Sequence, residues 1–183
     1  MRKIIAAINM TVDGFCDHTL LTADDEIHDH YTELLKSAGT LLYGRITYHL
    51  MEYWPTLLKN PTGNRSMDEF ALVMDKIPKV VFSHTLKDVT WSSARLAQRD
   101  LKAEVLAIRQ EAGKDILVGS RSLIIALLNL NLIDEFQLCI QPAIAGKGLS
   151  LFENINDRID LTLLKTKMFN SSGSILHYYQ PKK

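Results

Sequence analysis

Three short segments of the chain place glycine, hydroxyl and cationic residues directly after an apolar run. They are Gly44-Arg45-Ile46-Thr47, Ser83-His84-Thr85 and Gly119-Ser120-Arg121-Ser122. Such residues at the start of a helix suit a phosphate group, because the free backbone N–H groups and the helix dipole attract anions there. Taken one at a time, the segments are also explained by ordinary polar turns, or by serines that cap a helix.

Apolar runs and their spacing predict the elements that would position these segments. A short apolar run bounded by turn residues is typical of a buried strand, and recurrence every three to four residues is typical of a helix. Strands are expected at residues 3–9, 40–43, 79–83, 115–118, 136–143, 161–168 and 174–179. Helices are expected at residues 24–38, 46–53, 66–76, 100–111 and 123–128. The last of these helices is apolar on all sides, which predicts that it is deeply buried.

Local signals indicate where the helices begin and end. Gly39 fits a C-terminal stop for the first helix, and Pro55 is expected to close the second. Residues 57–65 are rich in Asn, Pro and Gly and are expected to form a loop. Ser66 followed by Glu69 is a capping-box pattern for the next helix.

This order of elements predicts an α/β fold in a single domain spanning residues 1–183. Strands that alternate with helices favour a mixed, mostly parallel central sheet covered on both faces, which is a three-layer α/β/α arrangement. Ser171-Ser172-Gly173 is a turn that makes the last two strands an antiparallel C-terminal hairpin. A chain of this length buries roughly 70% of its unfolded surface, which is enough for one sizeable core.

The charge balance argues against nucleic acid or a membrane surface as a partner. Lys plus Arg and Asp plus Glu are both 21, so the net charge is +0 and gives no global attraction for polyanions. The apolar run after Lys3 is too short for a signal peptide, and no stretch approaches the ~20 apolar residues of a membrane span. Cys16 and Cys139 are expected to be free thiols of a reducing compartment. We therefore expect a cytoplasmic protein.

The histidines of the first helix do not form a metal site. His28 and His30 are two residues apart, and positions i and i+2 of a helix point to nearly opposite sides. The His-x-Glu and Pro-Cys-x-x-Cys signature of zinc deaminases is absent from the sequence. Neither a metal nor deaminase chemistry is expected.

Several motifs, taken in order along the chain, resemble the dihydrofolate-reductase-like family. The resemblance is to the branch of the RibD C-terminal domain, the reductase domain of bacterial riboflavin biosynthesis. Each motif is weak alone, but the ordered set covers nearly the whole chain. The motifs are Asp13-Gly14-Phe15, Tyr43-Gly44-Arg45-Ile46-Thr47-Tyr48, Ser83-His84-Thr85-Leu86, Val118-Gly119-Ser120 and Gly146-Lys147-Gly148-Leu149-Ser150-Leu151-Phe152.

The resemblance implies a fold like that of dihydrofolate reductase, NADPH as hydride donor and often a homodimer. It implies cofactor-phosphate contacts for Gly44, Arg45 and Thr47, and a place near the adenosine ribose and its 2′-phosphate for Ser83, His84 and Thr85. Gly119 and Ser120 would meet the pyrophosphate and nicotinamide side, where Arg121 and Ser122 follow at the start of a helix. Asp13 would lie near the reacting ring.

Two features of the sequence depart from the family pattern. His84 stands where the family often has arginine, and histidine carries no fixed charge at pH 7, so NADH is not excluded as the cofactor. Ser120 stands where the family often has a second glycine. Counting back from Gly44 places His28 where dihydrofolate reductase has an acidic residue, which leaves His28, an adjacent carboxylate or water as the proton donor.

The function expected from these features is reduction of a small pyrimidine- or pteridine-like heterocycle by NADPH. The implied activity resembles that of 5-amino-6-(5-phosphoribosylamino)uracil reductase. Two alternatives stand beside it, namely a non-catalytic module that binds and senses a nucleotide, and a purely structural dimer that binds none.

Overall fold

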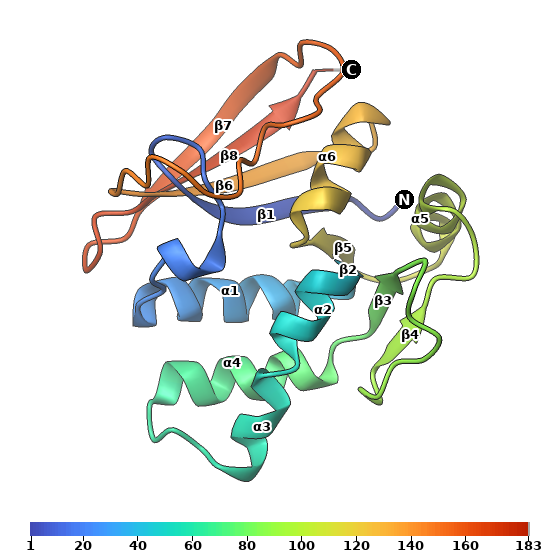
Figure 1. Cartoon of the computed structure of the whole chain (residues 1–183), viewed down its shortest axis with the longest axis horizontal. Coiled ribbons are helices and arrows are strands. Elements are labelled where there is room, and N and C mark those ends of the chain that lie inside the picture. The colour runs from blue at the N-terminus through green and yellow to red at the C-terminus, as the bar shows by residue number, and fades with distance from the viewer. Residues whose placement is uncertain (183) are drawn as a thin grey trace.

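The computed structural model describes residues 1–182, and their apolar runs assemble into one eight-stranded sheet with helices on both faces (Figure 1). The strands are β1 (Ile4–Thr11), β2 (Ala38–Gly44), β3 (Lys79–Phe82), β4 (Ala94–Leu96), β5 (Asp115–Val118), β6 (Glu135–Gln141), β7 (Leu161–Met168) and β8 (Ile175–Pro181). The helices are α1 (Asp25–Ser37), α2 (Arg45–Met51), α3 (Trp54–Lys59), α4 (Arg65–Lys76), α5 (Leu101–Gln110) and α6 (Arg121–Asn129), with a short 3-10 helix η1 (His18–Leu20).

The sheet is parallel through its centre and antiparallel at one end. Its strand order is β4-β3-β2-β5-β1-β6-β8-β7. All the pairs from β4 to β6 are parallel, whereas β8 pairs with β6 and β7 in the antiparallel sense. This confirms the predicted mixed sheet with its C-terminal hairpin. The carboxyl ends of β1, β2, β3 and β5 therefore meet at one edge, where ligands bind in open α/β sheets.

Alternate residues of the central strands supply two separate cores. Ile4, Leu42 and Ile116 face α5 and α6, while Ile5 and Leu41 face α1 and α4. The alternation follows from the two-residue period of a strand, which sends successive side chains to opposite faces. Figure 1 shows α1 and α4 on one side of the sheet and α6 on the other, which confirms the three-layer arrangement.

The segment between α2 and α4 was predicted wrongly in two respects. Residues 57–59, predicted as the start of a loop, belong to helix α3, and Pro55 lies in the first turn of that helix. Proline is tolerated there because the first turn of a helix needs no N–H donor from it. The cap of α4 is Asn64, whose side chain accepts a hydrogen bond from the Met67 N–H at 3.0 Å, and Ser66 is buried within the helix.

One further prediction fails at the end of the first helix, and one strand at the edge of the sheet was not predicted. Gly39 does not stop the helix but lies within β2, where an added Cβ would stand 3.1 Å from the Arg2 guanidinium and 3.2 Å from the Lys114 carbonyl oxygen. A glycine at this position therefore allows the Arg2 side chain and the Lys114 backbone to lie close to β2. Strand β4 was not predicted, because three residues are too few for a recognisable period.

His30 of α1 packs over a small third cluster between α1 and the β6–β8 pair. Its ring centroid lies 5.7 Å from that of Phe169 and 6.4 Å from that of Tyr178. Burial is the main cause that lowers the pKa of His30 to about 4. The nearby Lys167 and Lys165 also lower the pKa, and a side-chain hydrogen bond to Gln137 opposes the shift. His30 is therefore neutral in the folded protein at pH 7.

This burial predicts a loss of stability in mild acid. Since the unfolded histidine has a pKa near ~6.5, the unfolded state binds more protons between that pH and about 4, so the free energy of unfolding falls as pH is lowered through this window. A His30→Phe variant should lose this part of the pH dependence, on the order of 1 kcal/mol. Urea unfolding at pH 7 and pH 4.5 measures it, with His18→Asn as the exposed control. Equal acid losses in the wild type and His30→Phe would contradict it.

Candidate functional site

One hydrogen bond joins the ends of the neighbouring strands β2 and β5 at the carboxyl edge of the sheet. The Gly44 N–H donates to Ser120 Oγ over 2.8 Å, and both residues are buried. A Cβ on Gly44 would stand 3.3 Å from Ser122 Oγ, which shows how closely the two turns pack. The segments that begin at Gly44 and Gly119, both singled out in the sequence, are thus packed against each other and joined by a hydrogen bond.

Ser120 serves this contact rather than its own helix. Its side chain makes no capping hydrogen bond to α6 within the described chain, which corrects the expectation that it caps that helix. Its backbone angles, φ −95° and ψ 121°, are extended. An L-residue adopts them freely, so a serine in place of the family's second glycine introduces no strain. Ser122 and Gly119 are exposed on either side of it.

The second predicted segment lies beside the first. Parallel pairing places Gly44 opposite Phe82, so Arg45 and Ser83 follow at adjacent strand ends. Ser83 Oγ accepts hydrogen bonds from the Thr85 N–H at 3.1 Å and the Leu86 N–H at 2.9 Å, which shapes a tight turn. His84, Thr85 and Arg45 are exposed, and Thr47 is half-buried. The edge of the sheet therefore presents cationic and hydroxyl groups to solvent.

Arg121, in contrast, points away from these groups toward a long loop. Its Nε donates to the Ser150 carbonyl oxygen, and its guanidinium forms an ion pair of 2.6 Å with Glu153. Only 18% of the side chain is exposed. Arg121 therefore fixes the segment around residue 150 against the start of α6.

Asp13 holds the other end of the same loop. Its carboxylate accepts hydrogen bonds from Thr11 Oγ1 at 2.6 Å, from the Ala145 N–H at 3.0 Å and from the Gly146 N–H at 2.7 Å. These hydrogen bonds lower the pKa of Asp13 to about 2, and the bond from Thr11 has the largest effect. Asp13 is thus an ionised acceptor at neutral pH. Sequence reasoning missed this role, although Gly146, at φ 73°, marks the turn that presents its N–H.

His28 lies in the first turns of α1, on the side that faces α3 and α4. Its ring centroid is 5.8 Å from those of both Trp54 and Phe70, in edge-to-face contacts. Burial lowers the pKa of His28, although Asp25 and Asp24 oppose the shift. Its Nδ1 is buried and has no hydrogen-bond partner among residues 1–182. The imidazole is therefore predominantly neutral at pH 7.

A polar pair that the sequence did not reveal lies between α1 and β1. The Tyr31 hydroxyl donates to Asn9 Oδ1 over 2.7 Å. Burial raises the pKa of Tyr31 far above its ordinary value, so the hydroxyl keeps its proton. The pair depends on the tertiary packing of α1 on the sheet, which no local pattern encodes.

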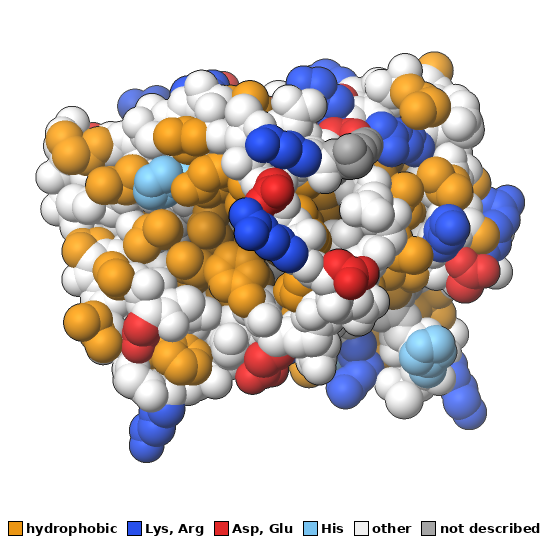
Figure 2. Space-filling view, turned by 90° about the horizontal axis from the view of Figure 1, so that it is seen from above, with side chains coloured by type: hydrophobic (Ala, Val, Ile, Leu, Met, Phe, Trp, Pro, Cys, Tyr) orange, Lys and Arg blue, Asp and Glu red, His pale blue; other side chains and the backbone are white. Residues whose placement is uncertain are grey.

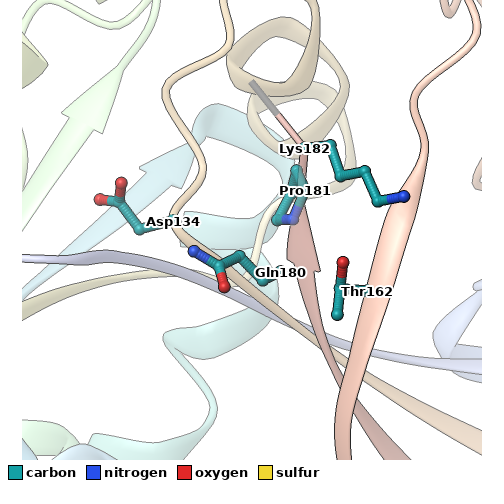
Figure 3. Close-up of a pocket in the computed structure, with 5 residues that line it drawn as sticks. All are labelled: Asp134, Thr162, Gln180, Pro181 and Lys182. Carbon is teal, nitrogen blue, oxygen red and sulfur yellow. The ribbon is translucent and has the colours of Figure 1, made fainter.

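A hollow lies at the amino ends of β1 and β6, whereas the Gly44–Ser120 contact lies at the carboxyl ends of the strands. Figure 3 shows the side chains that line this hollow. It is lined by Asp134, Thr162, Gln180, Pro181 and Lys182. Asp134 precedes β6 and accepts hydrogen bonds from Arg109 at 2.8 Å and the Ile4 N–H at 3.0 Å. Its role there is to hold the amino ends of two strands to α5.

The described residues contain no group of three or more His, Cys, Asp or Glu side chains that could hold a metal ion. Within residues 1–182, none of the helices has the length and apolar character needed to cross a membrane.

Comparison with known proteins identifies the family. The model of the RibD C-terminal domain matches residues 2–174. The Bacillus subtilis protein YyaP, itself uncharacterised, is 35% identical over 183 residues, covering 97% of this chain and 95% of YyaP. A pyrimidine reductase-like protein from Corynebacterium diphtheriae superposes with a TM-score of 0.70 at 14% identity, over 100% of this chain and 92% of the other.

Dihydrofolate reductase from Enterococcus faecalis, in a complex with NADP(H), has the same fold. Its TM-score is 0.66 at 13% identity, and the match covers 99% of this chain and 97% of the enzyme. Likeness at this level of identity concerns the fold alone, whereas the family match runs through all three strand-end segments. The chain belongs to the RibD C-terminal domain family.

Proposed function

We propose that the chain is a cytoplasmic, NADPH-dependent reductase of a small pyrimidine- or pteridine-like heterocycle. The activity would resemble that of 5-amino-6-(5-phosphoribosylamino)uracil reductase. The observation that carries the proposal is the Gly44–Ser120 hydrogen bond, which unites two strand-end segments beside a third at the carboxyl edge of the sheet. This is the place where α/β folds bind dinucleotides.

The residues at this edge fit a phosphorylated dinucleotide. Arg45 is an exposed cation, and the hydroxyl of Ser122 and the backbone of Gly119 are exposed beside it. In the proposal, Gly44, Arg45 and Thr47 bind the cofactor phosphates, with Ser120 holding Gly44 in place. Ser83, His84 and Thr85 lie at the adenosine ribose, and Gly119 lies toward the nicotinamide. The bound cofactor supplies a hydride, and the protein aligns it with the acceptor.

The roles of the two candidate catalytic residues follow from their contacts. Asp13 is ionised and engaged with Thr11 and two backbone amides, so it positions the loop around residues 145 and 146 beside the reacting ring rather than donating a proton. His28 is largely neutral and packed between Trp54 and Phe70, so it contributes to the wall of the substrate site. The proton that accompanies the hydride then comes from water.

The same observations favour a second candidate, a non-catalytic module that binds and senses a nucleotide. Neither Asp13, with a pKa of about 2, nor the half-buried His28, whose pKa is lowered, is an acid suited to protonating a substrate at neutral pH. A binding module needs no such acid. The two candidates share a cofactor site and differ only in turnover.

Titration with NADPH and with NADH, followed by calorimetry, tests the shared cofactor site. Wild-type protein should bind NADPH, and Arg45→Ala should weaken binding by about 10-fold or more, because a hydrogen bond to a charged group contributes about 1.5–3 kcal/mol. Gly44→Asp should abolish binding by adding a carboxylate beside the phosphates. Arg65→Ala, an exposed arginine of α4, is the matched control. Absence of binding to either nucleotide at millimolar concentration would leave only the fold.

Turnover separates the reductase from the binding module. NADPH oxidation, read at the nicotinamide absorbance, should occur with at least one member of a panel of pteridines, aminopyrimidines and quinones. The Gly44→Asp variant should show none. Stoichiometric NADPH binding without oxidation across the panel would instead favour the sensing module.

The edge of the sheet formed by β7 is the proposed contact for a second copy of this chain. All eight residues of β7 are exposed, and Leu163 and Met168 are 52% and 61% exposed. Ile175 of β8, which pairs with Met168, is 40% exposed. Figure 2 views the molecule from above, the side where β7 lies in Figure 1, and shows hydrophobic side chains gathered around a histidine. An open apolar edge strand is normally covered in the native state, and the family resemblance favours a homodimer.

Charge placed on this edge should prevent the dimer. Light scattering after size exclusion should give twice the mass of 20.7 kDa for the wild type and a single chain for Leu163→Glu with Met168→Glu. The two substitutions put like charges into the interface without disturbing a buried core. Thr162→Glu with Thr166→Glu is a control that adds the same negative charge to exposed positions of the same strand and keeps its apolar side chains. A monomeric wild type would contradict the assignment.

A further inference from the structure

Strand β4 brings a second set of polar residues beside the Ser83–Thr85 turn. β4 pairs with β3 in parallel, with Val81 opposite Leu96, and the Ala97 N–H donates to the Val81 carbonyl oxygen over 2.9 Å. The residues after β4 therefore emerge next to those after β3. Gln98 and Arg99 are both exposed at this point.

A buried carboxylate lies beneath these residues. Glu104 of α5 is only 2% exposed, yet its Oε1 lies 2.7 Å from the Arg95 guanidinium and its Oε2 lies 3.7 Å from that of Arg99. Oε2 has no hydrogen-bond donor among the described residues. A buried carboxylate requires a compensating cation, and Arg95, at hydrogen-bond distance, already provides it.

Arg99 therefore lies beside Glu104 without forming a hydrogen bond to it, and its guanidinium can still bind another anion. Its side chain is 55% exposed, and its distance from Glu104 is too long for a hydrogen bond. A guanidinium presents five N–H donors in a fixed fork that matches a phosphate group. The nearest residue in sequence, Asp100, is occupied as the N-cap of α5, where it accepts from the Ala103 N–H at 2.9 Å. Arg95 and Glu104 pair with each other, which leaves the Arg99 guanidinium without a hydrogen-bonded carboxylate among the described residues.

We propose that Arg99, oriented by Glu104, binds the phosphate that distinguishes a 2′-phosphorylated adenosine dinucleotide from its unphosphorylated form. The inference rests on the proposed cofactor site and adds a specificity-determining residue to it. Arg99 supplies, from the neighbouring strand, a guanidinium that the Ser83–Thr85 turn itself lacks. Arg45, at the end of β2, lies two strands away from β4 and serves phosphates common to both forms of the dinucleotide.

Calorimetry with 2′,5′-ADP and 5′-AMP isolates this contact from the rest of the cofactor. The wild type should bind 2′,5′-ADP at least about 10-fold more tightly than 5′-AMP. Arg99→Gln should weaken 2′,5′-ADP by about 10-fold or more and leave 5′-AMP within about twofold, which also shows that the variant is folded. Arg99→Lys should restore part of the preference by keeping the charge. Arg65→Gln, which removes the same charge from α4, should leave the preference intact.

The outcomes separate this inference from the proposed function. The role of Arg99 is overturned if the wild type binds 2′,5′-ADP and 5′-AMP equally. It is also overturned if Arg99→Gln weakens the binding of both nucleotides to the same extent, or of neither. In each case the proposed cofactor site still stands. If no adenosine nucleotide or NADPH binds at millimolar concentration, the proposed function is overturned and the inference with it. A loss confined to 2′,5′-ADP supports both.

Discussion

The hydrogen bond from the Gly44 amide to the Ser120 hydroxyl joins the two central turns of the sheet where its parallel strands end. Both residues are buried, so without this bond the Gly44 N–H would lose its partner in a place closed to water. The bond sets the spacing between the starts of α2 and α6. The positions of the exposed residues around it, such as Arg45 and Ser122, depend on that spacing.

A second constraint acts from the C-terminal half of the chain. Asp13 and Arg121 hold the two ends of one loop, the first through the amides of Ala145 and Gly146 and the second through Ser150 and Glu153. Further main-chain bonds join Gly14 to Leu151 and Cys16 to Leu149. The residues after β1 and the loop after β6 are thus tied together, although they are far apart in sequence.

The two outer strands of the sheet, β4 and β7, differ in the side chains that surround them. Glu104 is buried beside Arg95, and Arg99 remains partly exposed next to the turn after β3. At the opposite end, β7 keeps all its side chains exposed, including several large apolar ones. One end of the sheet therefore carries an exposed cation and the other an exposed apolar strand, and the proposals assign a cofactor to the first and a second copy of the chain to the other.

The sequence by itself determined the fold class, since apolar periods give every central strand and the buried helix α6, and it located the three strand-end segments. It missed α3 and β4, and it placed the cap of α4 at Ser66 rather than at Asn64, because a first-turn proline, a three-residue strand and the choice of a cap carry no periodic signal. Only the tertiary structure decided that Ser120 bonds to Gly44, that Asp13 binds backbone amides and that Arg99 stands beside the Ser83 turn. Each of these contacts joins residues distant along the chain, and strand pairing, rather than local propensity, brings them together.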